Sequence, residues 1–222
     1  MYAHRGLYGP NVLENSMESF RKALEKEGYV GFECDVRLSL DRIPVVNHDL
    51  SLRKVYGKDV LVSETKAAVL QKEGVPMVEE VLELLIEQHR KGKKKHIIFD
   101  IKGQSFIETV TKIMKLSKEK KVDHDQLVFL AWDSKYQDKY PKGARIYRVL
   151  ESDTFTESDV EGKWQGITAP YTATEENLRS IVDASTKTQM EINLHCKDEC
   201  KLKEFYATDF VTQSKTKFTI TV

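Results

Sequence analysis

The sequence predicts an α/β protein of the compact (β/α)8 class, the TIM barrel. Short apolar segments rich in β-branched residues alternate along the chain with segments that carry apolar residues at helical spacing. About eight of the short segments can be counted, which is the strand number of such a barrel. An open, doubly wound sheet would normally carry a glycine-rich phosphate loop near its start, and the sequence has none there.

The expected strands are short and span most of the chain. We expect them at residues 2–3, 30–38, 96–101, 127–131, 145–149, 166–169, 190–194 and 205–211. Residues 44–47 form a further short extended segment. Because no linker rich in proline, glycine or serine interrupts the series, we expect a single barrel domain over residues 1–222.

Helical spacing of apolar residues appears in four segments, at residues 14–29, 78–88, 106–120 and about 174–184. In the first segment, Asn15 and Glu18 stand at the spacing of a capping box, and Gly28 provides a stop. We therefore expect that helix to be capped by Asn15. The connections in the second half of the chain are short, which predicts an open cleft at the carboxyl ends of the strands.

The charge balance argues against some classes of function. The 222 residues include 35 Lys and Arg and 35 Asp and Glu, so the formal net charge is zero. A balanced charge gives no general attraction to nucleic acid or to an anionic membrane. The sequence has no run of about 18 apolar residues, so we expect no transmembrane segment.

The number of cysteines indicates the cellular compartment of the protein. Cys34, Cys196 and Cys200 are odd in number and sparse, which is typical of proteins in a reducing environment. No secretory leader is visible at the start of the sequence. We therefore expect a cytoplasmic protein, and we interpret Cys196 and Cys200 as ordinary thiols rather than as zinc ligands.

Two carboxylates stand one residue apart in the strand expected at residues 30–38. Because side chains alternate between the faces of a strand, Glu33 and Asp35 point the same way. Two adjacent carboxylates inside a barrel would repel each other, and a hard divalent cation would remove that repulsion. The alternative is a polar edge strand with solvated acids.

Three further segments carry side chains suited to metal binding, phosphate binding or proton transfer. Asp100 and Lys102 also share a face, and they could form a buried ion pair or provide a third metal ligand and a phosphate-binding charge. His4 and Arg5 offer a proton shuttle and a guanidinium that suits phosphate. His48 follows a second apolar run and could share acid–base work with His4.

These residues belong to segments that occur in a fixed order. The segments are Ala3-His4-Arg5-Gly6, Glu14-Asn15-Ser16, Ser19-Phe20, Gly31-Phe32-Glu33-Cys34-Asp35-Val36, Leu38-Ser39, Pro44-Val45-Val46, His48-Asp49, Val75-Pro76, Asp100-Ile101-Lys102 and Ala207-Thr208-Asp209. In this order they resemble the glycerophosphodiester phosphodiesterase family. The resemblance is dense over residues 3–53 and thin from about 103 to 204.

Members of that family are TIM barrels that cleave glycerophosphodiesters to glycerol 3-phosphate and an alcohol. The resemblance therefore implies a metal-dependent phosphodiesterase of glycerol and lipid metabolism that acts on a small molecule. By position, Glu33, Asp35 and Asp100 would bind Mg²⁺ or Ca²⁺. The resemblance further implies acid–base catalysis by His4 and His48, phosphate binding by Arg5 and Lys102, and supporting roles for Glu14 and Asn15. Either water or a hydroxyl of the substrate would serve as the nucleophile.

The chain departs from the family's pattern at three positions. Asp100 replaces the usual Glu, which shortens the ligand by one methylene, so the metal would shift or bind through water. Arg42 follows Asp41 where the family commonly has Gly, and a positive φ there would cost on the order of 1 kcal/mol. The family usually has a pocket-shaping Trp at about the position of Ile192, so the bound alcohol is not defined by the resemblance.

Three other features have a simpler interpretation. Trp132 could line the pocket or be an ordinary packing residue, and we favour packing. His195 could reach the cleft or be a polar residue at its rim, and we favour the rim. The run Asp123-His124-Asp125 has the residue types of a metal site. It stands between a helix and a strand, at the amino end of the expected barrel, so we interpret it as a solvated loop.

Two alternative functions remain. A related barrel enzyme, similar to a phospholipase D, could act on lysophospholipids or sphingomyelin with the same residues. Peripheral contact with lipid would then involve apolar residues near the first loop, namely Leu7, Tyr8, Val12 and Leu13. The other alternative is a non-catalytic barrel that binds a phosphorylated ligand. Binding alone needs cations more than proton shuttles, so the presence of both His4 and His48 favours catalysis.

Overall fold

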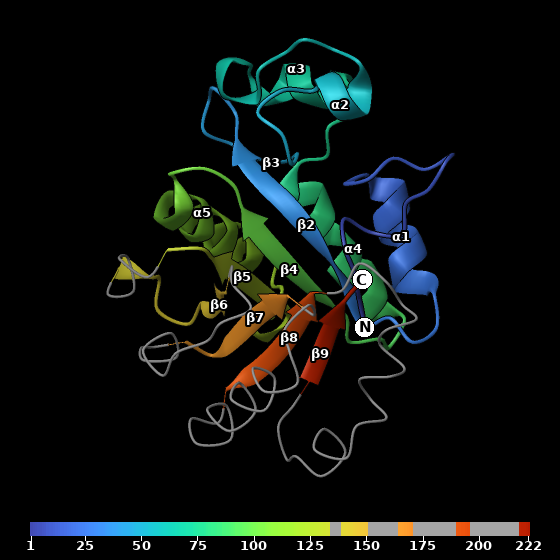
Figure 1. Cartoon of the computed structure of the whole chain (residues 1–222), viewed down its shortest axis with the longest axis vertical. Helices are drawn as coiled ribbons and strands as arrows, with labels where there is room; N and C mark the ends of the chain where they lie inside the picture. Colours follow the sequence, from blue (N-terminus) through green and yellow to red (C-terminus); the bar gives the residue numbers. More distant parts are fainter. Residues whose placement is uncertain (134–138, 151–163, 171–189, 196–217) are drawn as a thin grey trace.

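A computed structural model describes residues 1–133, 139–150, 164–170, 190–195 and 218–222, and these residues contain a closed barrel (Figure 1). Its parallel strands are β1 (Tyr2–Ala3), β2 (Gly31–Leu38), β4 (His96–Ile101), β5 (Leu127–Ala131), β6 (Arg145–Val149), β7 (Gly166–Pro170), β8 (Glu191–His195) and β9 (Phe218–Thr221). The barrel closes because β1 pairs in parallel with both β2 and β9. The expected (β/α)8 class is confirmed.

The strand predictions hold for the first seven barrel strands, within one residue at either end. The expected eighth strand at residues 205–211 lies outside the described residues, as does the helix expected at about 174–184. The strand that closes the barrel is β9, which the sequence did not predict. It pairs with β8 on one side and β1 on the other.

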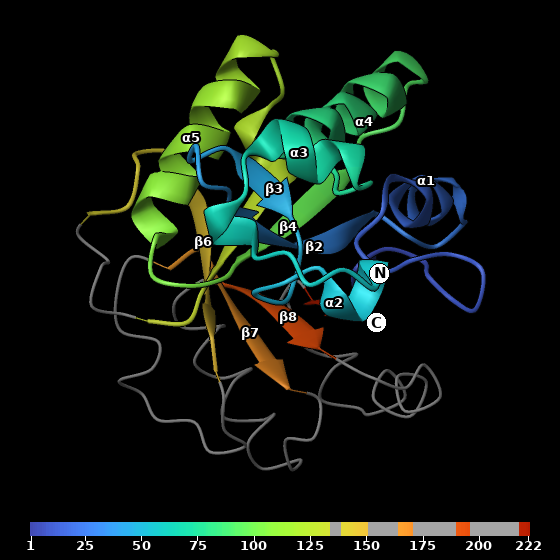
Figure 2. The same ribbon diagram turned by 90° about the horizontal axis from the view of Figure 1, so that it is seen from above.

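Three long helices cover the outer faces of β2 and β4 (Figure 2). They are α1 (Met17–Glu25), α4 (Val78–Arg90) and α5 (Phe106–Glu119). The helices pack there because alternate residues of each strand are apolar and point outward, where they form the main core. The ring of Phe20 on α1 stacks on Phe32 of β2, with centroids 4.2 Å apart.

The start of α1 differs from the prediction. Ser16 is the N-cap, and it exchanges hydrogen bonds with Ser19 in a capping box. The predicted pair of Asn15 and Glu18 is wrong, because Asn15 lies before the helix with φ 53°. That conformation frees the Asn15 side chain to point into the barrel.

Residues 47–77 form a small helical unit that the sequence did not predict. The short strand β3 (Pro44–Val46) pairs antiparallel with β2 and leads into α2 (Arg53–Tyr56), the 3-10 helix η1 (Val62–Glu64) and α3 (Ala67–Lys72). The unit packs around a separate apolar core, made by Val45 of β3 together with Leu52, Val62, Ala67, Leu70, Val75 and Met77. It lies beyond the ends of β2 and β3 (Figure 1).

Two local expectations are confirmed. Arg42 has a φ of 60°, and its guanidinium bonds to Glu108 and Ser105 on the neighbouring loop and helix. Asp123 begins the 3-10 helix η2 (His124–Gln126) at the amino end of β5, away from the cleft. Within the described residues, none of the helices combines the length and the apolar composition needed to cross a bilayer.

The inward faces of the strands divide the barrel into an apolar layer and a polar layer. Tyr2, Ile98, Val128 and Tyr147 belong to a buried apolar cluster inside the barrel. Asp35, Asp100 and Lys102 lie above it, toward the carboxyl ends of the strands. The apolar layer closes the barrel beneath them, as is usual for the packed interior of this fold.

The close pairing of β2 with β4 generates a first prediction. A Cβ at Gly31 would lie 1.9 Å from the backbone oxygen of His96, its register partner. Because neither strand can move without disturbing the barrel, we expect Gly31→Ala to lower the free energy of unfolding by about 1–3 kcal/mol in urea denaturation. Gly9→Ala is the matched control, since nothing lies within 4 Å of its added Cβ. Equal stability of the two variants would contradict this prediction.

Candidate active site

Three carboxylates meet inside the barrel. Glu33 and Asp35 lie on one face of β2, and Asp35 is the direct register partner of Asp100 on β4. One oxygen from each lies within 4.8 Å of the others. Their exposed fractions are 3%, 1% and 6%, so water cannot screen their repulsion.

Two cations contact the cluster. The Lys102 Nζ lies 2.6 Å from Asp100 Oδ2 and 3.1 Å from Asp35 Oδ1. The Arg5 Nε lies 3.1 Å from Asp35 Oδ2. The two positive charges therefore converge on Asp35, at the centre of the cluster.

Because both cations contact Asp35, the pKa values of the three carboxyl groups move in different directions. Burial raises the pKa of Glu33 well above its usual range, and the charges of Asp35 and Asp100 raise it further. Burial also raises the pKa of Asp100. At Asp35, burial is outweighed by Lys102, Arg5 and a hydrogen bond from Asn15, which together lower its pKa.

A strained turn after β1 brings Arg5 to the site. Arg5 has a φ of 55° and Gly6 a φ of 78°. At Gly6 a Cβ would lie 2.4 Å from Ser19 Oγ, so only glycine fits. In this turn the Arg5 backbone N–H donates to Glu33 Oε2 at 3.0 Å while its side chain reaches Asp35.

Asn15 and Glu14 support this arrangement. The Asn15 amide nitrogen donates to Asp35 Oδ2 at 2.7 Å, and its amide oxygen accepts from the Asp35 backbone N–H at 3.2 Å. Glu14 accepts from Arg5 Nη1 at 3.1 Å and pairs with Lys54 at 2.9 Å. Both residues therefore contact the site through Asp35 or Arg5.

The two predicted histidines lie at the same cavity in different environments. The Nε2 of His4 lies 3.8 Å from Glu33 Oε2, and burial, together with His195 and Arg5, lowers the pKa of His4 to about 3. His48 is more exposed, and its Nδ1 lies 2.7 Å from Asp49 Oδ1. The His48 backbone oxygen accepts a hydrogen bond from Arg37 Nε, which fixes the chain at the start of the small helical unit.

All these groups surround a cavity of about 390 Å³ at the carboxyl ends of the strands. Its polar lining includes His4, Arg5, Glu33, His48, Asp100 and Lys102. The apolar part of the lining includes Leu130, Val149 and Leu150. The structure therefore brings all nine predicted site residues together, six in the lining and Asp35, Glu14 and Asn15 in direct contact with it.

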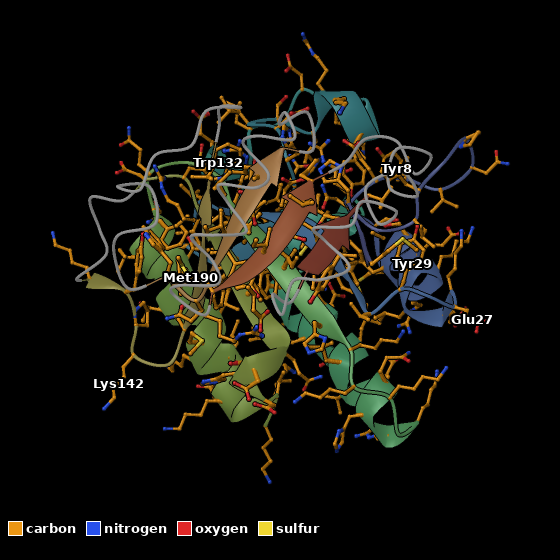
Figure 3. The ribbon with its side chains drawn as sticks, turned by 60° about the horizontal axis from the view of Figure 1, so that its bottom comes forward. Tyr8, Glu27, Tyr29, Trp132, Lys142 and Met190 are labelled. Atoms are coloured by element: carbon orange, nitrogen blue, oxygen red, sulfur yellow. The ribbon has the colours of Figure 1, made fainter. Side chains whose placement is uncertain are left out.

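Two residues that sequence analysis set aside also line this cavity. The indole N–H of Trp132 donates to Asp100 Oδ1 at 2.8 Å, so Trp132 lines the pocket and the favoured interpretation as ordinary packing is wrong. Figure 3 shows Trp132 at the same end of the barrel as Tyr8 of the first loop. His195 is not just a rim residue, because its ring stands edge-on to His4 with centroids 4.6 Å apart.

The expectation for Ile192 also needs correction. Ile192 is fully buried in the outer core, so an aromatic residue there would not shape the cavity. The cavity-facing residues of β8 are Asn193 and His195. Because side chains alternate between the faces of a strand, the sequence alone could have placed Asn193 and His195 on the opposite face from Ile192.

The donor set suits a divalent cation. All three candidate ligands are carboxylates, the type preferred by hard ions. Among the described residues, the only hydrogen bond that the Glu33 side chain accepts comes from the Arg5 backbone. A bound cation would stabilise a buried carboxylate that accepts so few hydrogen bonds.

A sequence model of the glycerophosphoryl diester phosphodiesterase family matches residues 4–140, more than half of the chain. The chain belongs to this family. It is also similar to glycerophosphodiester phosphodiesterase domain-containing protein 4 of Macaca fascicularis, with 48% identity over 56 residues. That match covers 24% of this chain and 8% of the relative, so the aligned part spans less than a tenth of that protein.

Solved structures share the barrel at low sequence identity. A glycerophosphodiester phosphodiesterase from Thermotoga maritima matches with a TM-score of 0.76 at 24% identity, over 99% of this chain and 92% of that one. A phosphodiesterase from Oleispira antarctica, solved with the product sn-glycerol-3-phosphate, matches with a TM-score of 0.76 at 18% identity, over 99% and 91% of the chains. At these identities the likeness shows the fold.

The raised pKa of Glu33 generates a second prediction. The unfolded chain releases the Glu33 proton near 4.5, before the folded protein does, so the folded state loses stability from this group as the pH rises above 4.5. A difference of one between the pKa values of a group in the folded and unfolded states corresponds to about 1.4 kcal/mol. We therefore expect Glu33→Gln to raise the free energy of unfolding of the metal-free protein by at least about 1 kcal/mol at pH 7.

Urea denaturation in EDTA at several pH values measures this effect. The gain should shrink as the pH falls through 4.5, below which Glu33 is protonated in both states. A Glu33→Gln variant that is less stable than the wild type at pH 7 would show that the buried carboxylate is compensated by other groups.

Proposed function

We propose that this protein is a metal-dependent phosphodiesterase that hydrolyses glycerophosphodiesters to glycerol 3-phosphate and an alcohol. The observation that carries this proposal is the convergence of three carboxylates, two cations and two histidines on one cavity. Membership of the glycerophosphoryl diester phosphodiesterase family supports it. The product bound in the Oleispira antarctica phosphodiesterase, whose barrel is similar, suggests the same product here.

Glu33, Asp35 and Asp100 would hold the cation, either Mg²⁺ or Ca²⁺, since both prefer oxygen ligands. When bound, the cation would neutralise negative charge on the phosphate and on the transition state. The nearby cations do not offset the burial of Glu33 and its repulsion by the other two carboxylates, as its raised pKa indicates. This is the reason to assign metal binding to the cluster rather than a simple ion-pair network.

Arg5 and Lys102 would bind the phosphate. In the structure, Lys102 bridges two of the carboxylates. A divalent cation between those carboxylates would repel the ammonium group, which could then turn toward a phosphate in the cavity. The Arg5 guanidinium offers a planar fork of donors that suits phosphate oxygens.

The histidines would divide the proton transfers. Burial lowers the pKa of His4, so its ring is neutral and has a lone pair to accept a proton from the nucleophile, and Glu33 Oε2, 3.8 Å from its Nε2, would stabilise the charged ring that results. His48 lines the cavity from the connection after β3, and the Asp49 carboxylate 2.7 Å from its Nδ1 orients the ring. We therefore assign the base to His4 and the acid, which protonates the leaving oxygen, to His48.

One observation favours a second substrate class. The apolar wall formed by Leu130, Val149 and Leu150 could accept a hydrocarbon part of the substrate. Tyr8 and Leu13 on the first loop are about half exposed and could contact a lipid surface. A related activity on lysophospholipids therefore stands as the alternative, beside a barrel that only binds a phosphorylated ligand.

A substrate panel separates these functions. We expect release of glycerol 3-phosphate from glycerophosphocholine in the presence of Mg²⁺ or Ca²⁺, with loss of at least about 100-fold in rate after EDTA treatment and recovery when the metal is restored. Parallel assays with a lysophospholipid measure the alternative. Turnover that is unaffected by EDTA would refute the metal role, and phosphodiester binding without turnover would support a binding barrel.

The proton-transfer assignment generates a further prediction. His4→Ala and His48→Ala should each lower kcat by about 10²–10⁴-fold, because each removes one general acid or base. His89→Ala is the matched control, since His89 is exposed on α4 away from the cavity. Steady-state kinetics with circular dichroism of each variant provide the measurement, and a kcat near that of the wild type in either site variant would refute its role.

A further inference from the structure

Trp132 contacts two of the charged groups of the candidate site at once. It follows β5 directly, and its indole N–H donates to Asp100 Oδ1 at 2.8 Å. The Lys102 Nζ lies 5.4 Å from the centroid of the same ring, which is a cation–π distance. The side chain is 44% exposed, so burial of its own surface does not explain this placement.

The chain around Trp132 is anchored from two directions. The Trp132 backbone oxygen accepts a hydrogen bond from the guanidinium of Arg148 on β6. The next backbone oxygen, that of Asp133, accepts from the Tyr140 hydroxyl at 3.1 Å. These contacts fix the backbone from which the indole reaches back over the cavity.

Both oxygens of Asp100 have a donor, and the two donors differ in charge. Lys102 donates to Oδ2 and Trp132 donates to Oδ1. A divalent cation that entered the carboxylate cluster would repel the Lys102 ammonium group, but it would not repel the neutral indole N–H. Trp132 is therefore the contact that would keep Asp100 oriented once the metal site is filled.

We propose that Trp132 is a positioning residue that orients Asp100 for metal binding and supports Lys102 with its ring. The inference rests on the proposed metal site. A ligating carboxylate is usually held by a hydrogen bond of this kind, and loss of such a partner weakens metal affinity by about 10–100-fold. Asp100 depends on it because its short side chain must meet the oxygens of Glu33 and Asp35 on the adjacent strand.

The test compares Trp132→Phe with Trp164→Phe in the full chain. Phenylalanine keeps an aromatic ring near Lys102 but has no N–H to donate. Isothermal titration calorimetry with Mg²⁺ and with Ca²⁺ measures the Kd of each variant. We expect Trp132→Phe to raise the Kd by about 10–100-fold and Trp164→Phe to leave it within about twofold of the wild type.

A spectroscopic measurement provides an independent readout. The chain has two tryptophans, so Trp132 is the sole emitter in the Trp164→Phe protein. Its fluorescence should change on titration with the metal and saturate at the calorimetric Kd, because the indole donates directly to a proposed ligand. The circular dichroism spectrum of metal-free Trp132→Phe should match that of the wild type, which shows that the barrel is intact and distinguishes positioning from a structural role.

The outcomes separate the two proposals. If the wild-type protein binds neither cation, the metal role in the proposed function fails, and this inference fails with it. If the wild type binds a cation and Trp132→Phe binds it equally well, the inference about Trp132 alone is overturned. Constant Trp132 emission through metal saturation would overturn it as well.

Discussion

The carboxylates of Glu33, Asp35 and Asp100 repel one another, because they lie within 4.8 Å in a region that water hardly reaches. Such a cluster persists in a folded barrel only if positive charge stands beside it. Lys102 and Arg5 supply that charge at Asp35, and Glu33 is left with a raised pKa. The local structure of the site can be understood as a response to this single constraint.

The turn after β1 is the clearest response. In the connection from β1 to α1, the positive φ angles at Arg5 and Asn15 are unfavourable for residues with side chains, by on the order of 1 kcal/mol each. They are retained because this connection then delivers a backbone N–H to Glu33 from Arg5, and the Arg5 guanidinium and the Asn15 amide to Asp35. Gly6 permits the turn because only its missing Cβ leaves room for Ser19.

The other groups reach the cavity from the carboxyl ends of β4, β5 and β8, and from the start of the small helical unit after β3. Each of these connections is held by its own contacts. Arg37 holds the backbone of His48, and Arg148 holds that of Trp132. The barrel thus fixes the acids on rigid strands, while the proton-transfer and positioning side chains come from anchored loops, as is usual for this fold.

Local patterns in the sequence determined the barrel class, seven of its eight strands, and the side-by-side placement of Glu33 with Asp35 and of Asp100 with Lys102. Alternation along a strand depends only on neighbouring residues, so it can be read directly. The sequence did not reveal β9, the cap at Ser16, the contact of Trp132 with Asp100 or that of His195 with His4. Each of the last two joins residues that are distant along the chain, and closure of the barrel alone decides which strand ends meet. The sequence therefore determined which chemical groups are present, and the tertiary structure decided which charges face each other, because electrostatic interaction depends on distance in space.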